Sequence, residues 1–545
     1  MKVQASQLNP TIGDLEGNTR KVLDALARAR TKAVDVVLFP ELTLTGYPPE
    51  DLLLDARFID AVEKKLQMIG PATKGLFVAV GLPRRNSRKK EKPLYNSAAI
   101  FIDGQLVGFK DKTLLPTYDV FDERRFFEPG REQAVFAYLG RKIAVTICED
   151  AWQHAGCVGY TDYQRDPIEE LCDKEVDLLL NLSASPYSFQ RDNARASVAT
   201  AAAQTLQSPV ILCNQVGAND QLVFDGHSLY VNEKGEQIQV ARGFVEEDLI
   251  VDLSTNACPC SPVEHGLQDL YSALVLGVRD YFHKQGFSRA ILGLSGGIDS
   301  ALVACIAKDA LGAEQVKAFA LPSRFSSPTS FEDAAKLAGN LGIALEKISI
   351  DEIFQEYLDR LEPLFGGKPF DMTEENLQSR IRGMILMAMA NKFGSILLNT
   401  GNKSEFAVGY TTLYGDMCGG LGVLLDVTKL RVYELARYVN RSGEVIPERI
   451  ITRAPTAELK ANQTDQDTLP PYEVLDPIIQ DYIEEGLSPQ EIAAKRRQLL
   501  PFVQGIIRKI HLAEYKRRQA PIGIRVTKKC FSRGRNIPIV QKWES

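Results

Sequence analysis

The stretch Ile291-Leu292-Gly293-Leu294-Ser295-Gly296-Gly297-Ile298-Asp299-Ser300 joins a short apolar run to an apolar helical segment, Ala301 to Leu311. A glycine-bearing turn between a strand and a helix leaves backbone N–H groups and the positive end of the helix dipole free to bind an anion. The lysine of a Walker A loop is missing, so this is a different kind of phosphate loop. An aspartate here would repel a phosphate unless a cation lay between them, so Asp299 predicts Mg²⁺ bridging to pyrophosphate oxygens. The alternative is that Asp299 and Ser300 only cap the helix.

Strands and helices alternate on both sides of this stretch. Buried strands are predicted at Ala290 to Leu294, Val316 to Leu321 and Ser395 to Asn399, with helical patterns between them. This alternation favours a doubly wound parallel sheet, a Rossmann-like fold that binds ligands beyond the carboxyl ends of its strands. We assign the domain to residues 269–545, after a linker at residues 254–268 that has two prolines, two cysteines and no periodicity.

The first 253 residues have a different pattern. Short apolar runs ending in turn or polar residues predict strands at Val34 to Phe39, Phe77 to Leu82, Ile143 to Ile147, Val176 to Leu182 and Pro209 to Asn214. Helical spacing covers Leu15 to Ala33, and hairpin turns are predicted at Asp103-Gly104 and Lys234-Gly235. Residues 1–253 are therefore predicted to form an α/β layered domain with mixed strand pairing.

Length and composition limit the class of protein. A chain of 545 residues exceeds the roughly 250–300 residues that one core can hold, so two domains are expected. The net charge of −6, from 64 basic and 70 acidic residues, argues against a nucleic-acid partner. The nine cysteines lack zinc-site spacing, and neither a signal pattern nor a membrane-length apolar run is seen. These features predict a cytoplasmic protein with small-molecule substrates and no membrane partner.

Three residues at or near the ends of predicted strands suggest chemistry in the first domain: Glu41, Lys112 and Cys148. Amide hydrolysis needs a nucleophile, a proton acceptor and a group that stabilises the oxyanion, and a thiol, a carboxylate and an ammonium can fill these roles. A nearby ammonium also favours the thiolate. Taken singly, each residue is more often part of the core or a solvated charge. The adjacent Glu149 is expected on the opposite face of an extended strand from Cys148, and it and Asp150 are given supporting roles.

The strings around these residues are Phe-Pro-Glu, Lys-x-x-Leu-Pro and Cys-Glu-Asp-x-Trp, and in that order they resemble the three signatures of the nitrilase superfamily. The resemblance implies an αββα sandwich in which Glu41 is the general base, Lys112 stabilises the oxyanion and Cys148 forms a thioester. It also implies that Tyr118, Ser185 and Arg191 bind glutamine. For Ser185 and Arg191 a surface role is equally open.

The Ser-Gly-Gly-x-Asp-Ser string resembles the pyrophosphate loop of the ATP pyrophosphatases, which cleave ATP to AMP and pyrophosphate and activate a carboxylate or carbonyl as an adenylate. The run Leu398-Asn399-Thr400-Gly401-Asn402-Lys403-Ser404-Glu405-Phe406-Ala407-Val408-Gly409-Tyr410 closely resembles the motif of the NAD synthetases. The resemblance implies that residues 293–300, Thr400 and Lys429 bind ATP, and that Glu405 lies at the metal and substrate site with Asp299.

Further strings imply that Asn376, Arg380 and Lys516, with Glu405, hold deamido-NAD. One departure is that the ammonia-only relatives have a lysine where Thr412-Leu413-Tyr414-Gly415-Asp416 has Leu413, so contacts there are not transferred.

The whole chain resembles the two-domain, glutamine-dependent branch of this family. That resemblance implies ATP-dependent and Mg²⁺-dependent amidation of deamido-NAD with ammonia from L-glutamine, in the last step of NAD biosynthesis, by a homo-oligomer with a synthetase-domain dimer and a larger assembly such as an octamer. Two rivals stay open: an amidating ATP pyrophosphatase with another acceptor, and a nucleotide sensor with spent active sites.

Overall fold

The computed structural model describes residues 1–545 except 158–162, 190–193, 256–257, 262–265, 462 and 544–545. The chain divides into two compact units, Met1–His265 and Gly266–Ser545. Strand β14 (Glu247–Asp252) ends the first unit's sheets, and helix α4 (Leu267–Gln285) begins the second unit. The predicted linker, 254–268, lies partly outside the described residues, and the predicted domain boundaries stay a prediction.

In the described part of the first unit, two six-stranded sheets contain most of the strands. The first has the order β14, β1 (Lys2–Gln7), β2 (Val36–Leu38), β3 (Phe77–Arg85), β4 (Leu94–Ile102) and β5 (Gln105–Asp111). The second has the order β13 (Gln237–Val240), β12 (Leu229–Val231), β9 (Val210–Asn214), β8 (Leu178–Ser183), β7 (Arg141–Ile147) and β6 (Val135–Tyr138). A short hairpin pairs β10 (Val216–Asn219) with β11 (Leu222–Asp225). The central strands are parallel and the outer pairs antiparallel, which is the mixed pairing that the sequence predicts.

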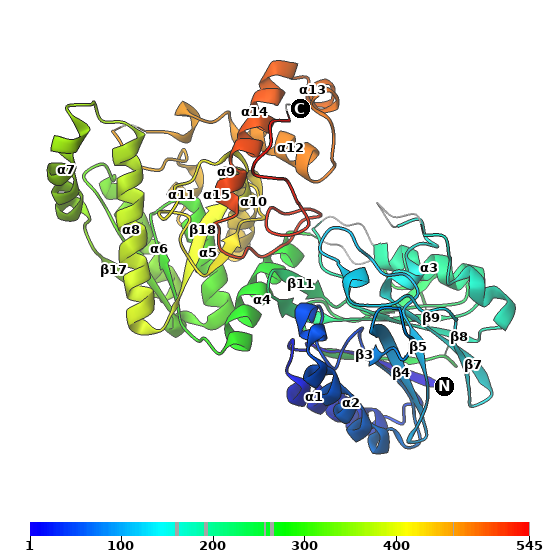
Figure 1. The fold of residues 1–545 in the computed structure, drawn as a ribbon. Helices are drawn as coiled ribbons and strands as arrows, with labels where there is room; N and C mark the ends of the chain where they lie inside the picture. The colour runs from blue at the N-terminus through cyan, green and yellow to red at the C-terminus, as the bar shows by residue number, and fades with distance from the viewer. Residues whose placement is uncertain (158–162, 190–193, 256–257, 262–265, 462, 544–545) are drawn as a thin grey trace. The chain divides into compact units, whose positions relative to one another are not determined.

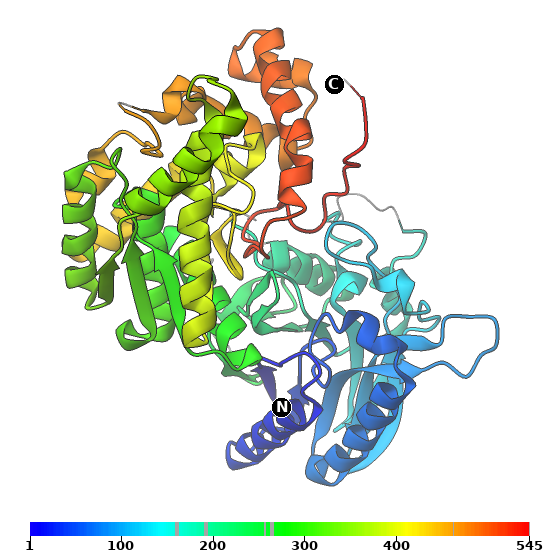
Figure 2. The same cartoon turned by 60° about the vertical axis from the view of Figure 1, so that its left-hand side comes forward.

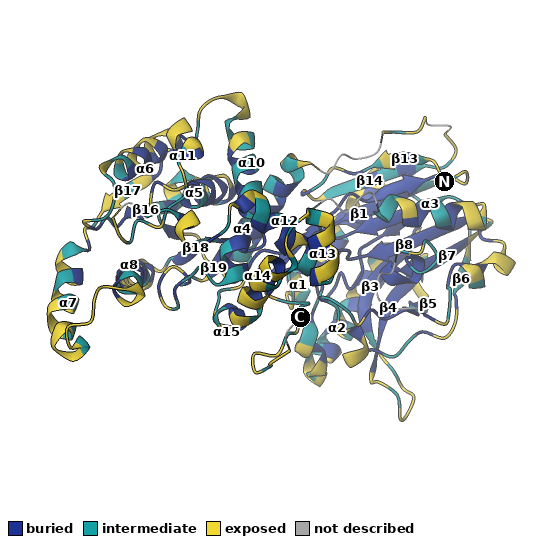
Figure 3. Cartoon of the chain, turned by 90° about the horizontal axis from the view of Figure 1, so that it is seen from above, coloured by how far each residue is buried: buried dark blue, intermediate teal, exposed yellow. Residues whose placement is uncertain are grey.

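Helices cover the outer faces of both sheets, as Figure 1 shows. The apolar stripe of α1 (Leu15–Thr31), which includes Val22, Leu26 and Ala29, packs with α2 (Ala56–Ile69) on the first sheet. The small residues of α3 (Ala194–Leu206) pack on the second sheet. A third apolar cluster lies between the sheets, so the central strands are buried on both faces (Figure 3). This αββα sandwich confirms the predicted fold class.

The second unit is built on a parallel sheet with the order β17 (Ala344–Lys347), β16 (Val316–Ala320), β15 (Ala290–Gly293), β18 (Ile396–Asn402) and β19 (Leu421–Leu424). The order reverses between β15 and β18, which confirms the doubly wound sheet and places a ligand crevice at their carboxyl ends. Helix α8 (Met372–Phe393) lies across one face of this sheet in Figure 2.

The other helices of this unit connect the strands or follow them. They are α5 (Ile298–Leu311), α6 (Pro328–Leu341), α7 (Asp351–Phe365), α9 (Lys403–Val408), α10 (Lys429–Val439), α11 (Glu448–Thr452), α12 (Tyr472–Ile483), α13 (Pro489–Arg496), α14 (Leu500–Leu512) and α15 (Glu514–Arg517). Helix α5 begins at Ile298 rather than Ala301, which puts Asp299 and Ser300 in its first turn. In the described part of the chain, no helix is long and apolar enough to cross a membrane.

Candidate active sites

The first unit brings Glu41, Lys112 and Cys148 together from three loops that follow β2, β5 and β7. All three side chains are buried. The Lys112 ammonium donates to Glu41 Oε1 over 2.6 Å. Both groups also act on the Cys148 thiol, because Glu41 raises its pKa and Lys112 lowers it.

A fourth residue, Glu123, belongs to this cluster and was missed by the sequence prediction. Its Oε1 accepts a hydrogen bond from Lys112 Nζ over 2.8 Å and another from the Tyr47 hydroxyl over 2.9 Å. Asn96 Nδ2 donates to Glu41 over 2.7 Å and, less closely, to Glu123. Glu123 lies five residues after Tyr118, where no spacing or periodicity distinguishes it from its neighbours.

Burial sets the protonation of this cluster. Burial and the neighbouring Glu41 raise the pKa of Glu123 to about 7, although Lys112 opposes the shift. Burial would lower the pKa of Lys112, but Glu123 and Glu41 together raise it well above its ordinary value. Burial and Glu41 also raise the pKa of Cys148 well above that of a free thiol. Lys112 does favour the thiolate, as expected, but burial and Glu41 outweigh its effect on the pKa of Cys148.

A protonated thiol needs a base, and the cluster contains an unused acceptor. Within the described residues, Glu41 Oε2 is buried and has no hydrogen-bond partner, while Oε1 accepts from Lys112 and Asn96. Leaving a carboxylate oxygen unpaired inside a protein is costly, so such an atom marks a site where another donor binds.

The backbone turns sharply at the nucleophile. Cys148 has φ +42°, an uncommon value for a residue with a side chain, and Cys148–Ala151 form a 3₁₀ turn. The expectation of an extended strand is therefore wrong, and so is the argument that directs Glu149 away by strand alternation. Glu149 is buried, and its Oε1 accepts hydrogen bonds from the hydroxyls of Tyr118 (2.8 Å) and Tyr163 (3.0 Å). Burial raises the pKa of Glu149.

The remaining predicted residues of the first unit are placed as follows. Asp150 Oδ1 accepts the backbone N–H groups of Thr113 (2.8 Å) and Leu114 (2.9 Å), so it ties the Lys112 loop to the nucleophile turn. Ser185 is buried, and its backbone N–H donates to Asn214 Oδ1 over 2.8 Å. Arg191 lies outside the described residues.

In the second unit, the Ser-Gly-Gly stretch forms a tight loop between β15 and α5. Gly296 has φ +81°, and a Cβ there would lie 2.3 Å from the Ser330 carbonyl oxygen, so only glycine fits. No side-chain hydrogen bond caps α5. The Ser300 hydroxyl instead donates to the Gly297 carbonyl over 3.0 Å and accepts from the Ser295 N–H over 3.3 Å. The capping alternative therefore lacks its hydrogen bond, and the helix N-terminus can bind an anion.

Beside this loop, three carboxylates surround one ammonium. Lys429 Nζ donates to Asp299 Oδ2 over 2.5 Å and to Glu405 Oε1 over 3.4 Å, and the third carboxylate, Asp465, is buried nearby. Burial would lower the pKa of Lys429, but Asp299 and Glu405 raise it above its ordinary value. Burial raises the pKa of Glu405 to about 8. Lys429 opposes this shift, and the negative charge of Asp299 adds to it. The cluster has more acid than base, and carboxylate oxygens are the ligands that Mg²⁺ prefers, so these residues fit a divalent cation.

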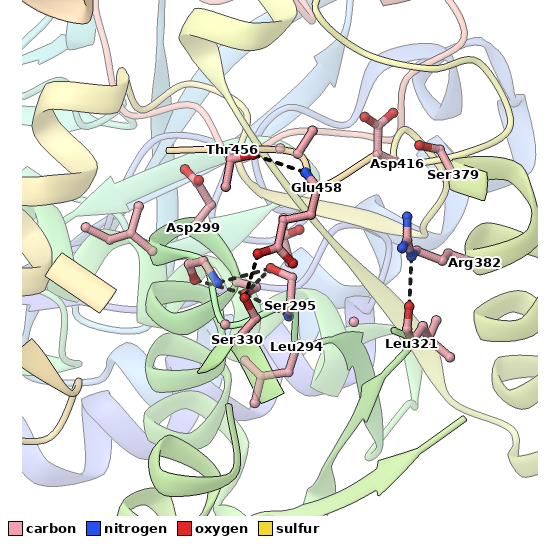
Figure 4. A pocket seen from close by; sticks show the side chains of 18 of the residues that line it. Leu294, Ser295, Asp299, Leu321, Ser330, Ser379, Arg382, Asp416, Thr456 and Glu458 are labelled. Atoms are coloured by element: carbon pink, nitrogen blue, oxygen red, sulfur yellow. Dashed lines mark hydrogen bonds between the residues drawn. The ribbon is translucent and has the colours of Figure 1, made fainter. Parts of the chain in front are cut away.

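The loop and the cluster line one cavity of about 330 Å³, part of which Figure 4 shows. Of the predicted residues, Thr400, Glu405, Lys429 and all eight of residues 293–300 line it. Asn376, Arg380 and Lys516 are not among the lining residues. Asn376 Oδ1 accepts from the Thr412 hydroxyl over 2.8 Å, exposed Arg380 donates to the Leu413 carbonyl over 3.2 Å, and Lys516 donates to the Gly409 and Thr411 carbonyls.

Residues that the sequence prediction did not select also line the cavity. Among them are Arg382, Asp416, Glu458 and Asp465. Glu458 accepts from the Ser330 hydroxyl over 2.7 Å and pairs with Arg453, so the segment after α11 lies over the loop (Figure 4). Alternation of strands and helices predicts strand ends but not which later segment folds back onto them, so the sequence analysis gave these residues no role.

Comparison with known proteins gives a consistent result. The carbon-nitrogen hydrolase family model matches residues 2–258, and the NAD synthase family model matches residues 270–520. The glutamine-dependent NAD(+) synthetase of Synechocystis sp. is 46% identical over 99% of this chain and 98% of its own length. The glutamine-dependent NAD(+) synthetase of Thermotoga maritima is 43% identical over 100% of this chain and 99% of its own length. The solved structure of the Acinetobacter baumannii glutamine-dependent NAD+ synthetase in complex with ADP is 41% identical, covers 99% and 98% of the two chains, and has a TM-score of 0.78.

Proposed function

The chain belongs to the glutamine-dependent NAD(+) synthetase family, and from this premise we propose how its two sites divide the reaction. The enzyme is a ligase that makes NAD(+) with glutamine as the nitrogen donor. In our proposal the first unit releases ammonia from L-glutamine. The second unit uses ATP to adenylate the carboxylate of deamido-NAD, and ammonia then displaces AMP. The two clusters centred on Lys112 and Lys429 carry this proposal, together with the full-length similarity.

In the first unit, the Cys148 sulfur attacks the side-chain amide carbon of glutamine. Because the pKa of the thiol is raised, it enters the reaction protonated, and the unpaired Glu41 Oε2 accepts its proton. The oxyanion forms beside the Lys112 ammonium. Glu41 returns the proton to the leaving nitrogen, ammonia departs and a thioester remains. Water then adds to the thioester, and the products are glutamate and the free thiol.

We assign binding of the α-amino and α-carboxylate end of glutamine to Tyr118, Glu149 and the residues near them. The buried Glu149 carboxylate offers a negative charge to an α-ammonium group, and Tyr118 and Tyr163 hold it in place. Ser185, held by Asn214, and Arg191 would bind the α-carboxylate.

In the second unit, the uncapped N-terminus of α5 and Lys429 would hold the phosphates that leave as pyrophosphate. The acceptor carboxylate oxygen bonds to the α-phosphorus as the bond to the β-phosphate oxygen breaks. Ammonia then attacks the carboxyl carbon, a proton is lost, and AMP leaves. Asp299 and Glu405 would hold Mg²⁺, which supplies positive charge against the phosphates. Deamido-NAD would be held by Asn376, Arg380, Glu405 and Lys516. Of these four residues, only Glu405 lines the cavity.

We also propose a homo-oligomer and a cytoplasmic location. Exposed apolar side chains on α7 and α8, among them Leu364, Met372 and Met384, support a dimer of the second unit. All nine cysteines lie within the described residues and none forms a disulfide bond, which supports a reducing compartment.

The direct test is a product assay. The protein would be incubated with ATP, Mg²⁺ and glutamine, and with deamido-NAD or one of several other carboxylic acceptors. We expect NAD(+), AMP, pyrophosphate and glutamate to form when deamido-NAD is the acceptor, and no amidated product to form with the other acceptors. Amidation of another acceptor instead would favour the rival amidase, and the absence of AMP with every acceptor would favour the sensor.

A further inference from the structure

Helix α8 presents one stripe of side chains to the cavity of the second unit. Ser379, Arg382, Gly383 and Leu386 line it, at the spacing of three, four and seven residues that marks one helix face. Arg380 stands two residues before Arg382, about 200° around the helix, and is exposed, with its Nε bonded to the Leu413 carbonyl. Of these two arginines, Arg382 faces the cavity.

Arg382 is fixed beside the start of the Ser-Gly-Gly loop. Its Nε donates to the Leu321 carbonyl over 2.9 Å (Figure 4). Leu321 directly follows β16, and two residues earlier the Phe319 carbonyl accepts the Leu294 N–H over 2.9 Å, just before Ser295. The hydrogen bond of Nε therefore anchors one edge of the guanidinium next to the loop that binds phosphate.

The charge of Arg382 lacks a close acidic partner. Among the described residues, no carboxylate lies within salt-bridge distance of it, although Glu458 and Asp351 act on it from further away. Burial lowers its pKa to about 10, so it stays charged at neutral pH. A half-buried cation without a salt bridge, in a cavity otherwise rich in carboxylates, is arranged to bind an anion.

We propose that Arg382 binds the α-phosphate of ATP and the same phosphate in the adenylate. The α5 N-terminus and Lys429 already account for the phosphates that leave as pyrophosphate. As the acceptor carboxylate bonds to the α-phosphorus and the bond to the pyrophosphate oxygen breaks, negative charge stays on the equatorial oxygens of that phosphorus. The free edge of the guanidinium can donate to those oxygens from a fixed position, without any proton transfer.

This inference rests on the proposed function but adds a residue that none of the family's strings assigned. Two other roles are possible for an arginine in this cavity. It could stack on the adenine ring, or it could bind the carboxylate of the acceptor, and each gives a different result in the experiment below.

The test is equilibrium binding of AMP and of adenosine to the full-length protein, compared for the wild type and Arg382→Gln. We expect Arg382→Gln to weaken AMP binding about 10-fold to 100-fold, as for the loss of a charge-assisted hydrogen bond, and to leave adenosine binding unchanged. The affinity of Arg382→Lys for AMP should lie between those of the wild type and Arg382→Gln, because lysine keeps the charge but lacks the planar guanidinium. Lys392→Gln, which removes an exposed charge from the same helix, is the matched control and should bind both ligands as the wild type does.

Unchanged adenosine binding also shows that the variant is folded. Equal weakening of AMP and adenosine would overturn the proposal, whether its cause is stacking on adenine or a damaged fold. Unchanged AMP binding with a raised KM for deamido-NAD would overturn it in favour of the acceptor carboxylate. These readouts are separate from the proposed function, which the wild-type product assay tests alone.

Discussion

The two candidate active sites contain the same arrangement of charges but differ in how exposed it is. In each, one lysine ammonium lies between two carboxylates: Lys112 between Glu41 and Glu123, and Lys429 between Asp299 and Glu405. In the first site these side chains are at most 5% exposed, and in the second the two carboxylates are 17% and 18% exposed and line a cavity. The first cluster is nearly sealed around one thiol, whereas the second leaves room for a nucleotide.

The difference follows from the chemistry of each half. Transfer of a proton between sulfur, carboxylate and nitrogen needs groups that are prepositioned and shielded from water. Binding a triphosphate needs an accessible cluster whose acidic excess can be met by a divalent cation. The comparison therefore predicts that substitutions in the first cluster lower NAD(+) synthesis from glutamine only. Substitutions in the second cluster should lower synthesis from both glutamine and ammonium.

The largest expected effect comes from Cys148→Ala. Without the sulfur no thioester can form, so glutamine-supported NAD(+) synthesis should fall by about 10⁴-fold or more, while synthesis from an ammonium salt should continue. The measurement is NAD(+) formation with each donor at mildly alkaline pH. Residual glutamine-supported synthesis near the wild-type rate would show that the nucleophile is assigned wrongly.

The same exchange at both lysines tests the comparison directly. We expect Lys112→Met to lower glutamine-supported synthesis by about 10²-fold to 10³-fold and to leave ammonium-supported synthesis unchanged. Lys429→Met should lower synthesis from both donors by a similar factor. Rates with each donor and the affinity for ATP would be measured for both variants. Loss of ammonium-supported synthesis in Lys112→Met would mean that the two sites are not separate.

A third buried cluster in the first unit serves as a contrast, because we expect it to stabilise the fold. Asp225 is buried between Arg195 and His227, whose Nδ1 lies 3.0 Å from Asp225 Oδ2. Burial acts to raise the pKa of Asp225, but Arg195 and His227 hold it below its ordinary value. Its contribution to stability is therefore present above the unfolded pKa of about 4 and is lost as the pH falls through the lower, folded pKa.

Asp225→Asn should lower the free energy of unfolding by about 3–5 kcal/mol at pH 7, because it leaves Arg195 buried without its partner. The difference from the wild type should shrink at pH 3. Urea unfolding at the two pH values checks this, and ammonium-supported synthesis by the folded variant should be unchanged. A difference of the same size at both pH values would contradict the assigned charge on Asp225.

The smallest effect tests the backbone of the second site. Gly296→Ala places a Cβ 2.3 Å from a carbonyl oxygen at φ +81°, and the strain should cost about 1–3 kcal/mol and raise the KM for ATP. Gly297→Ala is the matched control, since its φ is −91° and its Cβ would lie 3.3 Å from the Ser295 hydroxyl. Thermal unfolding and ATP kinetics of both variants are compared. Equal effects at the two glycines would remove the argument for a tight loop.

The sequence by itself determined the layers and the main chemistry of each half. Apolar runs bounded by turns are a local property, and β3, β7, β8, β9 and β15 lie where such runs predict them. Glu41, Lys112 and Cys148 were selected because they lie near predicted strand ends and because their strings resemble those of the nitrilase superfamily, and Asp299 because it stands in a glycine turn before a helix. These signals come from residues close together in the sequence, so they can be recognised without knowledge of the fold.

Only the tertiary structure decided which charges neutralise each other. Glu123 shares the Lys112 ammonium, Asp465 joins the Lys429 cluster, and Arg382 rather than Arg380 faces the cavity. The raised pKa of Cys148 also followed from burial and from Glu41, which together outweigh the opposite effect of Lys112. The physical reason is that electrostatic energies depend on distance and on desolvation, and both are set by residues far apart in the chain.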